Sequence, residues 1–243
     1  MDSIDKLMDK AILLYGNAYR LSEESCVVKG NDGMYSIYGL VNGRAEKLRT
    51  SREFSILSPD YNEFSDGGFH KGTRVCDNMG NTVCNNMAYT SIVSVKGNLL
   101  VAYGKFYYDG VSVYDIITGE PFKEKEISNT YSYIRMYDHM DYIIAFKKSF
   151  NIVDIYDMNL ERVDVGRYRS IIVTDKILIC SLESIVYDIY DIKLNKIACY
   201  KDKVNFKINK DATMDVRIEL SSGENKMFTG LRKSKPIGKK KVG

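Results

Sequence analysis

The sequence predicts an all-β fold of repeated four-stranded antiparallel sheets, preceded by one N-terminal α-helix. A recurring motif supports this: a β-branched residue, an aromatic or small residue and an aspartate, then a turn with Gly or Asn. Its clearest copy runs from Val111 to Asp115 and continues into the turn Thr118-Gly119. The composition agrees, because nineteen Tyr, nine Phe and many Val and Ile residues favour strands.

The spacing of the motif sets the size of the repeat. Its anchor positions are residues 39, 77, 115, 157, 191 and 219, which lie 38, 38, 42, 34 and 28 residues apart. Periods of about 20 to 50 residues are typical of solenoids, propellers and arrays. A sheet with two apolar faces must stack on its neighbours. The repeats therefore predict one repeat domain over residues 22–229. Its aspartate anchors are Asp77, Asp115, Asp157 and Asp191.

Residues 1–21 contain the one predicted helix, from residue 3 to residue 15. Asp2 or Ser3 can cap its start, and Gly16-Asn17 can close its end. Its apolar residues keep helical spacing, with charges on the other face. These residues are Ile4, Leu7, Met8, Ala11, Ile12 and Tyr15. We expect the helix to dock on the body and cover an exposed face; the alternative is an amphipathic element reserved for a partner.

After Leu21 the pattern changes to short strands joined by hairpin turns. In the third repeat, strands are predicted at Ile92 to Val95, Leu99 to Tyr103, Val111 to Asp115 and Pro121 to Ile127. The next two repeats copy this order over 134–165 and 171–200. The aspartate ends the third strand, where its carboxylate can accept hydrogen bonds from amides of the following turn.

The segment Val111 to Glu120 resembles the third-strand and turn signature of β-propeller blades. Lys71 to Asn81 resembles the short WG-type repeats of bacterial and phage proteins. The resemblance covers residues 24–228 and implies a β-propeller of four-stranded blades. It departs from the familiar subfamilies, because the chain has no Trp and no Gly-His pair starts a unit.

The number of blades depends on the two incomplete repeats at the ends. The first lacks an obvious inner strand pair and the last is short. Propellers often close by pairing strands from both chain ends in one blade, which removes exposed sheet edges. Fusing the two repeats gives five blades, which we prefer, and keeping them separate gives six.

Patterns for metal binding or phosphate binding are weak. The two histidines, His70 and His139, have no metal-ligand neighbour at a recognised spacing. The stretch from Gly67 to Thr73 has the glycine spacing of a phosphate loop, but Thr73 stands where the lysine is required. The sequence predicts no metal and no cofactor.

Paired acids invite a catalytic interpretation. Asp154 with Asp157, and Asp188 with Asp191, could serve a metal or a glycosidase. They recur at strand ends in successive repeats, which favours a structural role. We therefore predict that the protein is not an enzyme.

The loops between second and third strands carry the residues best suited to recognition. In a closed propeller these loops share one face, so their aromatics and lysines would gather around the tunnel mouth. Such clusters suit a protein or an acidic partner. The candidate binding residues are Phe69, His70, Lys71, Tyr107, Tyr108, Lys147, Lys148 and Phe150. The alternative is ordinary solvated loops whose aromatics pack on their own blade.

Residues 230–243 form a basic tail. Its six basic residues are Arg232, Lys233, Lys235, Lys239, Lys240 and Lys241. Removing these six from the totals leaves 29 basic against 32 acidic residues, so the body carries −3 within a net charge of +3. Pro236, three glycines and few apolar side chains predict disorder. The tail is either simply solvated or binds nucleic acid or another anionic partner.

The five cysteines are odd in number and form no CxxC pair. Cys180 lies in an apolar run and is expected to be buried. Charged residues near the N-terminus interrupt the apolar stretch that a signal peptide requires. No apolar run approaches the about 20 residues of a membrane span. We therefore expect an intracellular, cytoplasmic protein without membrane contact, in host cytoplasm or a virion if the chain is viral.

Together these observations favour a non-catalytic interaction module, or a structural component of a larger assembly, including a viral or phage one. A protein partner is expected. The first alternative is an enzyme or small-ligand binder that uses the propeller tunnel. The second is nucleic-acid binding through the basic tail.

Overall fold

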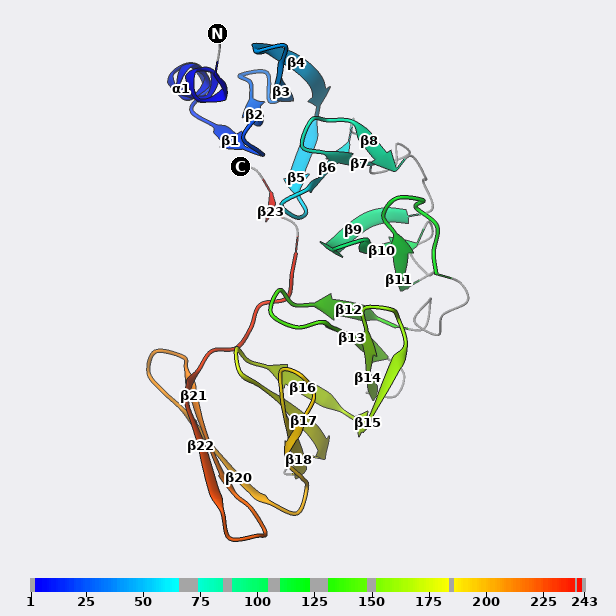
Figure 1. Ribbon diagram of the computed structural model, residues 1–243, viewed down its shortest axis with the longest axis vertical. Coiled ribbons are helices and arrows are strands. Elements are labelled where there is room, and N and C mark those ends of the chain that lie inside the picture. Colours follow the sequence, from blue (N-terminus) through cyan, green and yellow to red (C-terminus); the bar gives the residue numbers. More distant parts are fainter. Residues whose placement is uncertain are drawn as a thin grey trace. The chain divides into compact units, whose positions relative to one another are not determined.

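A computed structural model gives the fold of the chain. It describes residues 3–65, 74–84, 89–104, 110–122, 131–147, 152–183, 186–238 and 240–241. In these residues one helix precedes a series of short strands that form six antiparallel sheets (Figure 1). The predicted all-β class, with repeated antiparallel sheets and one N-terminal helix, is confirmed.

The chain divides into two compact units. Unit 1 consists of residues 1–124 and 238–243, and unit 2 consists of residues 125–237. Each unit holds three of the six sheets found in the described residues. The predicted repeat domain, 22–229, therefore spans parts of both units.

Unit 1 begins with helix α1, Ile4–Tyr15. The Ser3 side chain accepts a hydrogen bond from the backbone N–H of Lys6 and caps the helix start. Gly16 ends it in the left-handed conformation, with φ of 77°. Ile4 and Ala11 pack against a buried pair on the adjoining sheet, Cys26 and Val28. The helix is therefore docked on the first sheet, as expected.

The sheets of unit 1 follow one another along the chain. Sheet I contains β1 (Ala18–Arg20), β2 (Ser25–Lys29), β3 (Tyr35–Val41) and β4 (Arg44–Ser51). Sheet II contains β5 (Glu53–Ile56), β6 (Tyr61–Ser65), β7 (Arg74–Asp77) and β8 (Thr82–Cys84), with β23 (Lys240–Lys241) added beside β5. Sheet III contains β9 (Tyr89–Lys96), β10 (Leu99–Gly104) and β11 (Val111–Asp115). An isolated bridge joins Tyr114 to Pro121 at the start of the predicted fourth strand.

Unit 2 repeats this plan. Sheet IV contains β12 (Tyr133–Met136), β13 (Tyr142–Lys147), β14 (Ile152–Asp157) and β15 (Arg162–Tyr168). Sheet V contains β16 (Ser170–Val173), β17 (Ile177–Glu183), β18 (Val186–Asp191) and β19 (Lys196–Ala198). Sheet VI contains β20 (Lys203–Ile208), β21 (Met214–Glu219) and β22 (Asn225–Leu231).

The repeat anchors occupy equivalent positions. Each ends the third strand of its sheet, opposite the first residue of the second strand. The pairs are Asp77 with Tyr61, Asp115 with Leu99, Asp157 with Tyr142 and Asp191 with Ile177. Each carboxylate accepts hydrogen bonds from backbone amides of the following turn, at 2.8–2.9 Å. The aspartates therefore fix the hairpins, as Asx turns do.

Successive sheets within a unit pack face to face through apolar side chains. In unit 2, Ile144 of sheet IV shares a buried cluster with Leu178 of sheet V. Ile179, on the opposite face of sheet V, shares another with Val216 of sheet VI. Clusters of the same kind join sheet I to sheet II and sheet II to sheet III. The stacking explains why the motif is repeated, since no sheet covers both of its own faces.

The C-terminal segment, defined as the described residues 232–238 and 240–241, forms backbone hydrogen bonds to sheet strands, which differs from the disorder predicted for residues 230–243. In unit 2, Ser234 N–H donates to the Val173 carbonyl at 2.9 Å, and Ile237 N–H donates to Met136 at 2.8 Å. In unit 1, β23 pairs with β5. Composition did not reveal this, because the segment is held by backbone hydrogen bonds to sheet edges rather than by buried side chains.

In the described residues the end repeats form sheet I of unit 1 and sheet VI of unit 2, and the number of blades stays a prediction. Sheet I is a complete four-stranded sheet whose first strand, Ala18–Arg20, has only three residues. A strand this short carries too few residues to show an alternating pattern. The six sheets in the described residues are consistent with the predicted five or six blades.

Candidate functional site: an aromatic and basic cavity in sheet IV

Of the predicted loop-face residues, the structure describes only Lys147, the last residue of β13. Phe69, His70, Lys71, Tyr107, Tyr108, Lys148 and Phe150 lie outside the described residues. Lys147 lines a cavity of about 370 Å³ in unit 2. This cavity is the candidate site.

The cavity lies at one end of sheet IV. Its lining residues are Ser132, Tyr133, Phe146, Lys147, Ile152, Val153 and Arg169. Strand register brings them together: Tyr133 is opposite Phe146, and Lys147 is opposite Ile152. Arg169 comes from the connection between β15 and β16. Residues far apart in the sequence thus meet because three strands share one end.

Aromatic rings form one wall. The rings of Tyr133 and Phe146 stack with centroids 4.3 Å apart and planes 24° apart. The guanidinium of Arg135 lies 4.9 Å from the first ring and 5.3 Å from the second. Phe146 is buried, whereas Tyr133 is 41% exposed. The wall can therefore receive an apolar or planar group on a ring already held in place by its neighbours.

A buried carboxylate fixes the basic wall. Asp154 of β14 lies 3.3 Å from Lys147 Nζ and 2.9 Å from the guanidinium of Arg162. Two cations thus share one buried acid, which leaves this cluster with net positive charge. Arg169, at the cavity rim, makes no ion pair with a described residue. The cavity therefore combines an aromatic surface with excess positive charge.

The Asp154 carboxylate also accepts a hydrogen bond from Tyr131. The Tyr131 hydroxyl donates to Asp154 Oδ2 at 2.7 Å and lies 2.5 Å from the hydroxyl of Tyr156. Burial, followed by the hydrogen bonds with Tyr156 and Asp154, raises the pKa of Tyr131 far above its usual value. Tyr131 therefore stays protonated and acts as a donor that positions Asp154.

A second copy of this arrangement joins Tyr168 of sheet IV to Asp188 and Tyr190 of sheet V. Tyr168 donates to Asp188 Oδ2 at 2.8 Å and lies 2.5 Å from the hydroxyl of Tyr190. Lys196 Nζ lies 3.0 Å from the same carboxylate. Asp154 and Asp188 thus bind tyrosines and cations, whereas their sequence partners, Asp157 and Asp191, bind turn amides. The paired acids have separate structural partners.

The described basic residues of the predicted tail are exposed and divided between the units. Arg232, Lys233 and Lys235 belong to unit 2, and Lys240 and Lys241 to unit 1. Lys239 lies outside the described residues. Lys241 lines a cavity of about 270 Å³ together with Arg52, Glu53 and Glu63.

His139 holds the C-terminal segment in unit 2. Its Nε2 lies 3.0 Å from the Thr174 carbonyl and 3.3 Å from the hydroxyl of Ser234.

Within the described ranges, no group of three or more His, Cys, Asp or Glu side chains could hold a metal ion. The same ranges contain no helix long and apolar enough to cross a membrane.

No family model matches the chain, and no curated protein matches it. Solved structures do. Hsv2 of Kluyveromyces lactis is 10% identical over 90% of this chain and 97% of its own, with a TM-score of 0.40. BamB of Moraxella catarrhalis is 14% identical over 90% and 73%, with a TM-score of 0.34. The C-terminal WD40 domain of Sif2 is 13% identical over 86% and 70%, with a TM-score of 0.38. Similarities at this level carry no argument about partners, and the fold class rests on the six described sheets.

Of the residues that line the cavity, the sequence predicted Lys147 alone as a binding residue. Lys147 was selected as a loop lysine, whereas Tyr133, Phe146 and Arg169 were not. The missing signal was register: Tyr133 begins the first strand of its sheet, so its partner on the second strand, Phe146, could have been counted across the hairpin.

Proposed function

We propose that this β-propeller-type chain is a non-catalytic interaction module that binds an acidic segment of a protein partner in the cavity of sheet IV. The observation that carries the proposal is the meeting of the exposed Tyr133 ring with Lys147 and Arg169 around one cavity. Aromatic and arginine side chains at one concave site are typical of interface anchors.

The charges of the cavity indicate the ligand. Asp154 is already shared by Lys147 and Arg162, so a ligand carboxylate would find cations whose charge is incompletely neutralised. Arg169 is suited to a carboxylate because its planar guanidinium can donate in parallel to both oxygens. A large apolar side chain next to that carboxylate would lie on Tyr133 and Ile152. The preferred ligand is therefore an acidic residue beside a large apolar one.

The chemistry of the lining supports a binding role. The described lining residues are Ser, Tyr, Phe, Lys, Ile, Val and Arg, with no His, Cys or carboxylate among them. The nearest buried acid, Asp154, is occupied by Tyr131 and two cations. Groups of these kinds recognise and orient a ligand without a titrating acid–base pair.

We further propose that the module works in a reducing compartment. Four described cysteines are free, and Cys26, Cys76 and Cys180 are buried. Burial raises the pKa of Cys26 to about 11 and that of Cys76 to about 12. Buried thiols with a raised pKa stay protonated and pack as small apolar groups.

Fluorescence anisotropy with a labelled peptide of Asp-Leu repeats tests the binding proposal. We expect the full chain to bind it, and Arg169→Glu to weaken binding at least about tenfold, the equivalent of about 1.4 kcal/mol. The matched control is Arg167→Glu, since Arg167 is an exposed residue of β15 two positions before Arg169 and does not line the cavity. Equal weakening by both variants, or equal binding of a Lys-Leu peptide, would contradict the proposal.

A further inference from the structure

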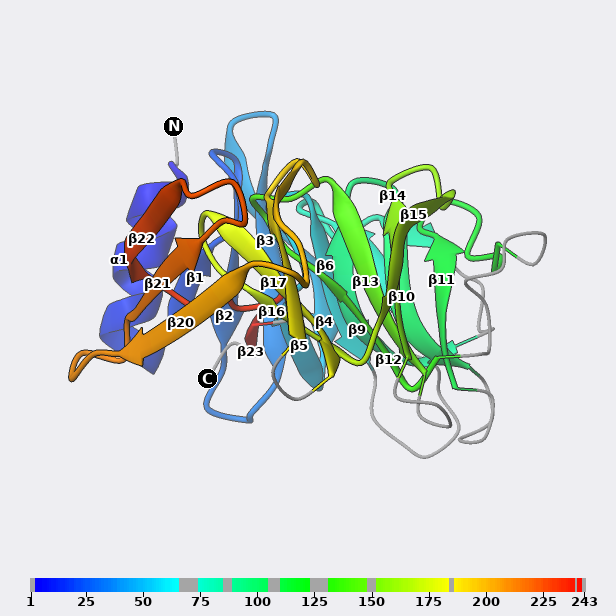
Figure 2. The ribbon, with the colours of Figure 1, turned by 90° about the horizontal axis from the view of Figure 1, so that it is seen from below.

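In the part of the chain that the structure describes, sheet VI has three strands, whereas sheets I, II, IV and V each have a further strand beside the second one. In those sheets the second strand lies between a first strand and a third strand. In sheet VI, Lys203 is opposite Glu219, just as Ile177 is opposite Asp191 in sheet V. This register makes β20 the second strand of its sheet. No described strand pairs with its other side (Figure 2).

The register also identifies which residues face the vacant place. In sheet V the first strand, β16, pairs with Leu178 to Ser181, which directly follow Ile177. In sheet IV, β12 pairs with Ile143 to Phe146, which directly follow Tyr142. The equivalent residues of β20 are Val204 to Lys207. Their backbone has hydrogen-bonding capacity on a side where the other sheets have a partner strand.

The exposure of β20 agrees with a missing neighbour. Of the equivalent residues of β17, Leu178, Ile179 and Cys180 are buried and Ser181 is partly buried. In β20 only Val204 is partly buried, whereas Phe206 is 38% and Ile208 is 79% exposed. Apolar side chains on an open strand edge mark a place where another strand can add.

Strand addition already occurs elsewhere in this chain. In unit 1, β23 adds to the free side of β5. In unit 2, Lys233 forms a bridge with Thr174, next to the end of β16. The described residues of the C-terminal segment are engaged in these contacts and do not pair with β20.

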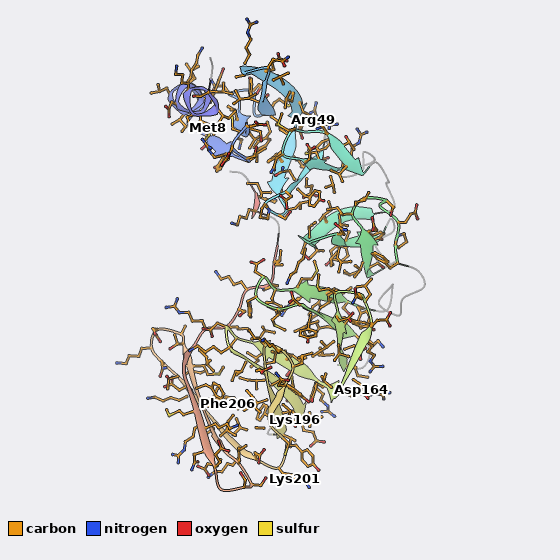
Figure 3. All side chains as sticks on the ribbon, in the orientation of Figure 1. Met8, Arg49, Asp164, Lys196, Lys201 and Phe206 are labelled. Atoms are coloured by element: carbon orange, nitrogen blue, oxygen red, sulfur yellow. The ribbon has the colours of Figure 1, made fainter. Side chains whose placement is uncertain are left out.

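The two faces of β20 define the chemistry of that strand. On one face, Phe206 packs edge-on against Tyr187 with ring centroids 5.0 Å apart (Figure 3 labels Phe206). Ile208 lies on the same face as Phe206, because side chains alternate between the two faces of a strand. The opposite face carries Lys203 and Lys207. Lys203 Nζ lies 3.4 Å from the Glu219 carboxylate, whereas Lys207 is exposed and makes no ion pair with a described residue. One face therefore favours apolar residues and the other favours acids.

We propose that the free edge of β20 binds an extended segment of a partner protein, with alternating acidic and apolar residues, as the missing first strand of sheet VI. Backbone hydrogen bonds along Val204 to Lys207 supply the affinity, and the alternate side chains supply the selectivity. A second copy of β20 is a poor occupant, because pairing two copies would place lysines near lysines. The proposal is independent of the cavity in sheet IV.

Hydrogen exchange on the full chain tests the proposal, with a peptide of alternating Glu and Val as the probe. We expect the outward-facing amides within 204–207 to exchange rapidly in the free protein and to become protected when the peptide is added. A peptide with the same side chains but N-methylated at alternate residues should bind at least about tenfold more weakly. The experiment is repeated in the Arg169→Glu variant, which removes any contribution from the cavity.

Charge variants provide the second measurement. Lys207→Glu should weaken peptide binding about tenfold. Lys176→Glu, which changes an exposed lysine in a turn of sheet V, should not weaken it. Three results would overturn the proposal: protection of these amides in the free protein, no added protection at about 1 mM peptide, or equal binding by the N-methylated peptide. Concentration-dependent dimerisation abolished by Lys207→Glu would instead identify a second copy as the occupant, and would also overturn it.

Discussion

The hydroxyl of Tyr168, in sheet IV, donates a 2.8 Å hydrogen bond to the carboxylate of Asp188, in sheet V. Tyr168 ends β15, and Asp188 lies in the third strand of the next sheet. The bond therefore ties one repeat to the next. Tyr131 and Asp154 make the same bond at the start of sheet IV. The repeats of unit 2 are joined by a polar contact as well as by apolar stacking.

Replacing Tyr168 by Phe should destabilise the protein by about 1–3 kcal/mol, because a buried carboxylate loses a donor. Urea unfolding monitored by circular dichroism measures the change. The control is Tyr200→Phe, since Tyr200 is largely exposed. Identical unfolding midpoints for the two variants would show that the Tyr168–Asp188 bond contributes nothing to stability.

Ile144→Ala and Ile179→Ala should each cost about 2–5 kcal/mol in unfolding free energy. Both side chains are buried in the middle of second strands and stack on neighbouring sheets. Ile172→Ala on β16 is the control, because Ile172 is partly exposed. Losses under about 1 kcal/mol at both buried positions would argue against the stacking described here.

Deleting residues 232–243 should lower the melting temperature. The deletion removes the backbone hydrogen bonds of Ser234 and Ile237 to sheets V and IV, and the pairing of β23 with β5. Replacing Lys233, Lys235 and Lys240 by Gln keeps those bonds and should leave the melting temperature nearly unchanged. Differential scanning calorimetry distinguishes the two, and an unaltered melting temperature after deletion would restore the expectation of a disordered tail.

Stability should fall between about pH 4 and pH 2 in part through Asp202. Backbone hydrogen bonds from Cys199 and Ser221 lower the pKa of this carboxyl to about 2. A folded-state pKa below the unfolded value contributes stability above the unfolded pKa, and that contribution is lost as pH falls through the folded pKa. Asp202→Asn should therefore show a shallower decline in melting temperature over this range. A decline as steep as in the wild type would remove Asp202 from the explanation.

The elements with strong periodicity were predictable from the sequence. Helix α1 and the aspartate turns depend on residues close together in the chain, such as Ser3 at the helix start and Asp157 with its own turn. The docking of residues 232–237 and 240–241 was not predictable, because the backbone groups that hold them are the same in every sequence.

The candidate site was predictable only in part. The expectation of lysines beside aromatics led to Lys147, which lines the cavity. Tyr133 and Arg169 reach that cavity through strand register and through the connection to the next sheet. Such long-range placement depends on the pairing of whole strands, which local residue patterns do not specify.

The most direct test of the acid-binding cavity is a charge-swap cycle at Arg169, measured by calorimetric titration. The wild type and Arg169→Glu are each titrated with the Asp-Leu peptide and with a Lys-Leu peptide of equal length. We predict that Arg169→Glu loses the acidic peptide and gains the basic one, with a coupling of at least about tenfold. Additive effects, with both peptides weakened or unaffected alike, would contradict the assignment of this cavity as the binding site.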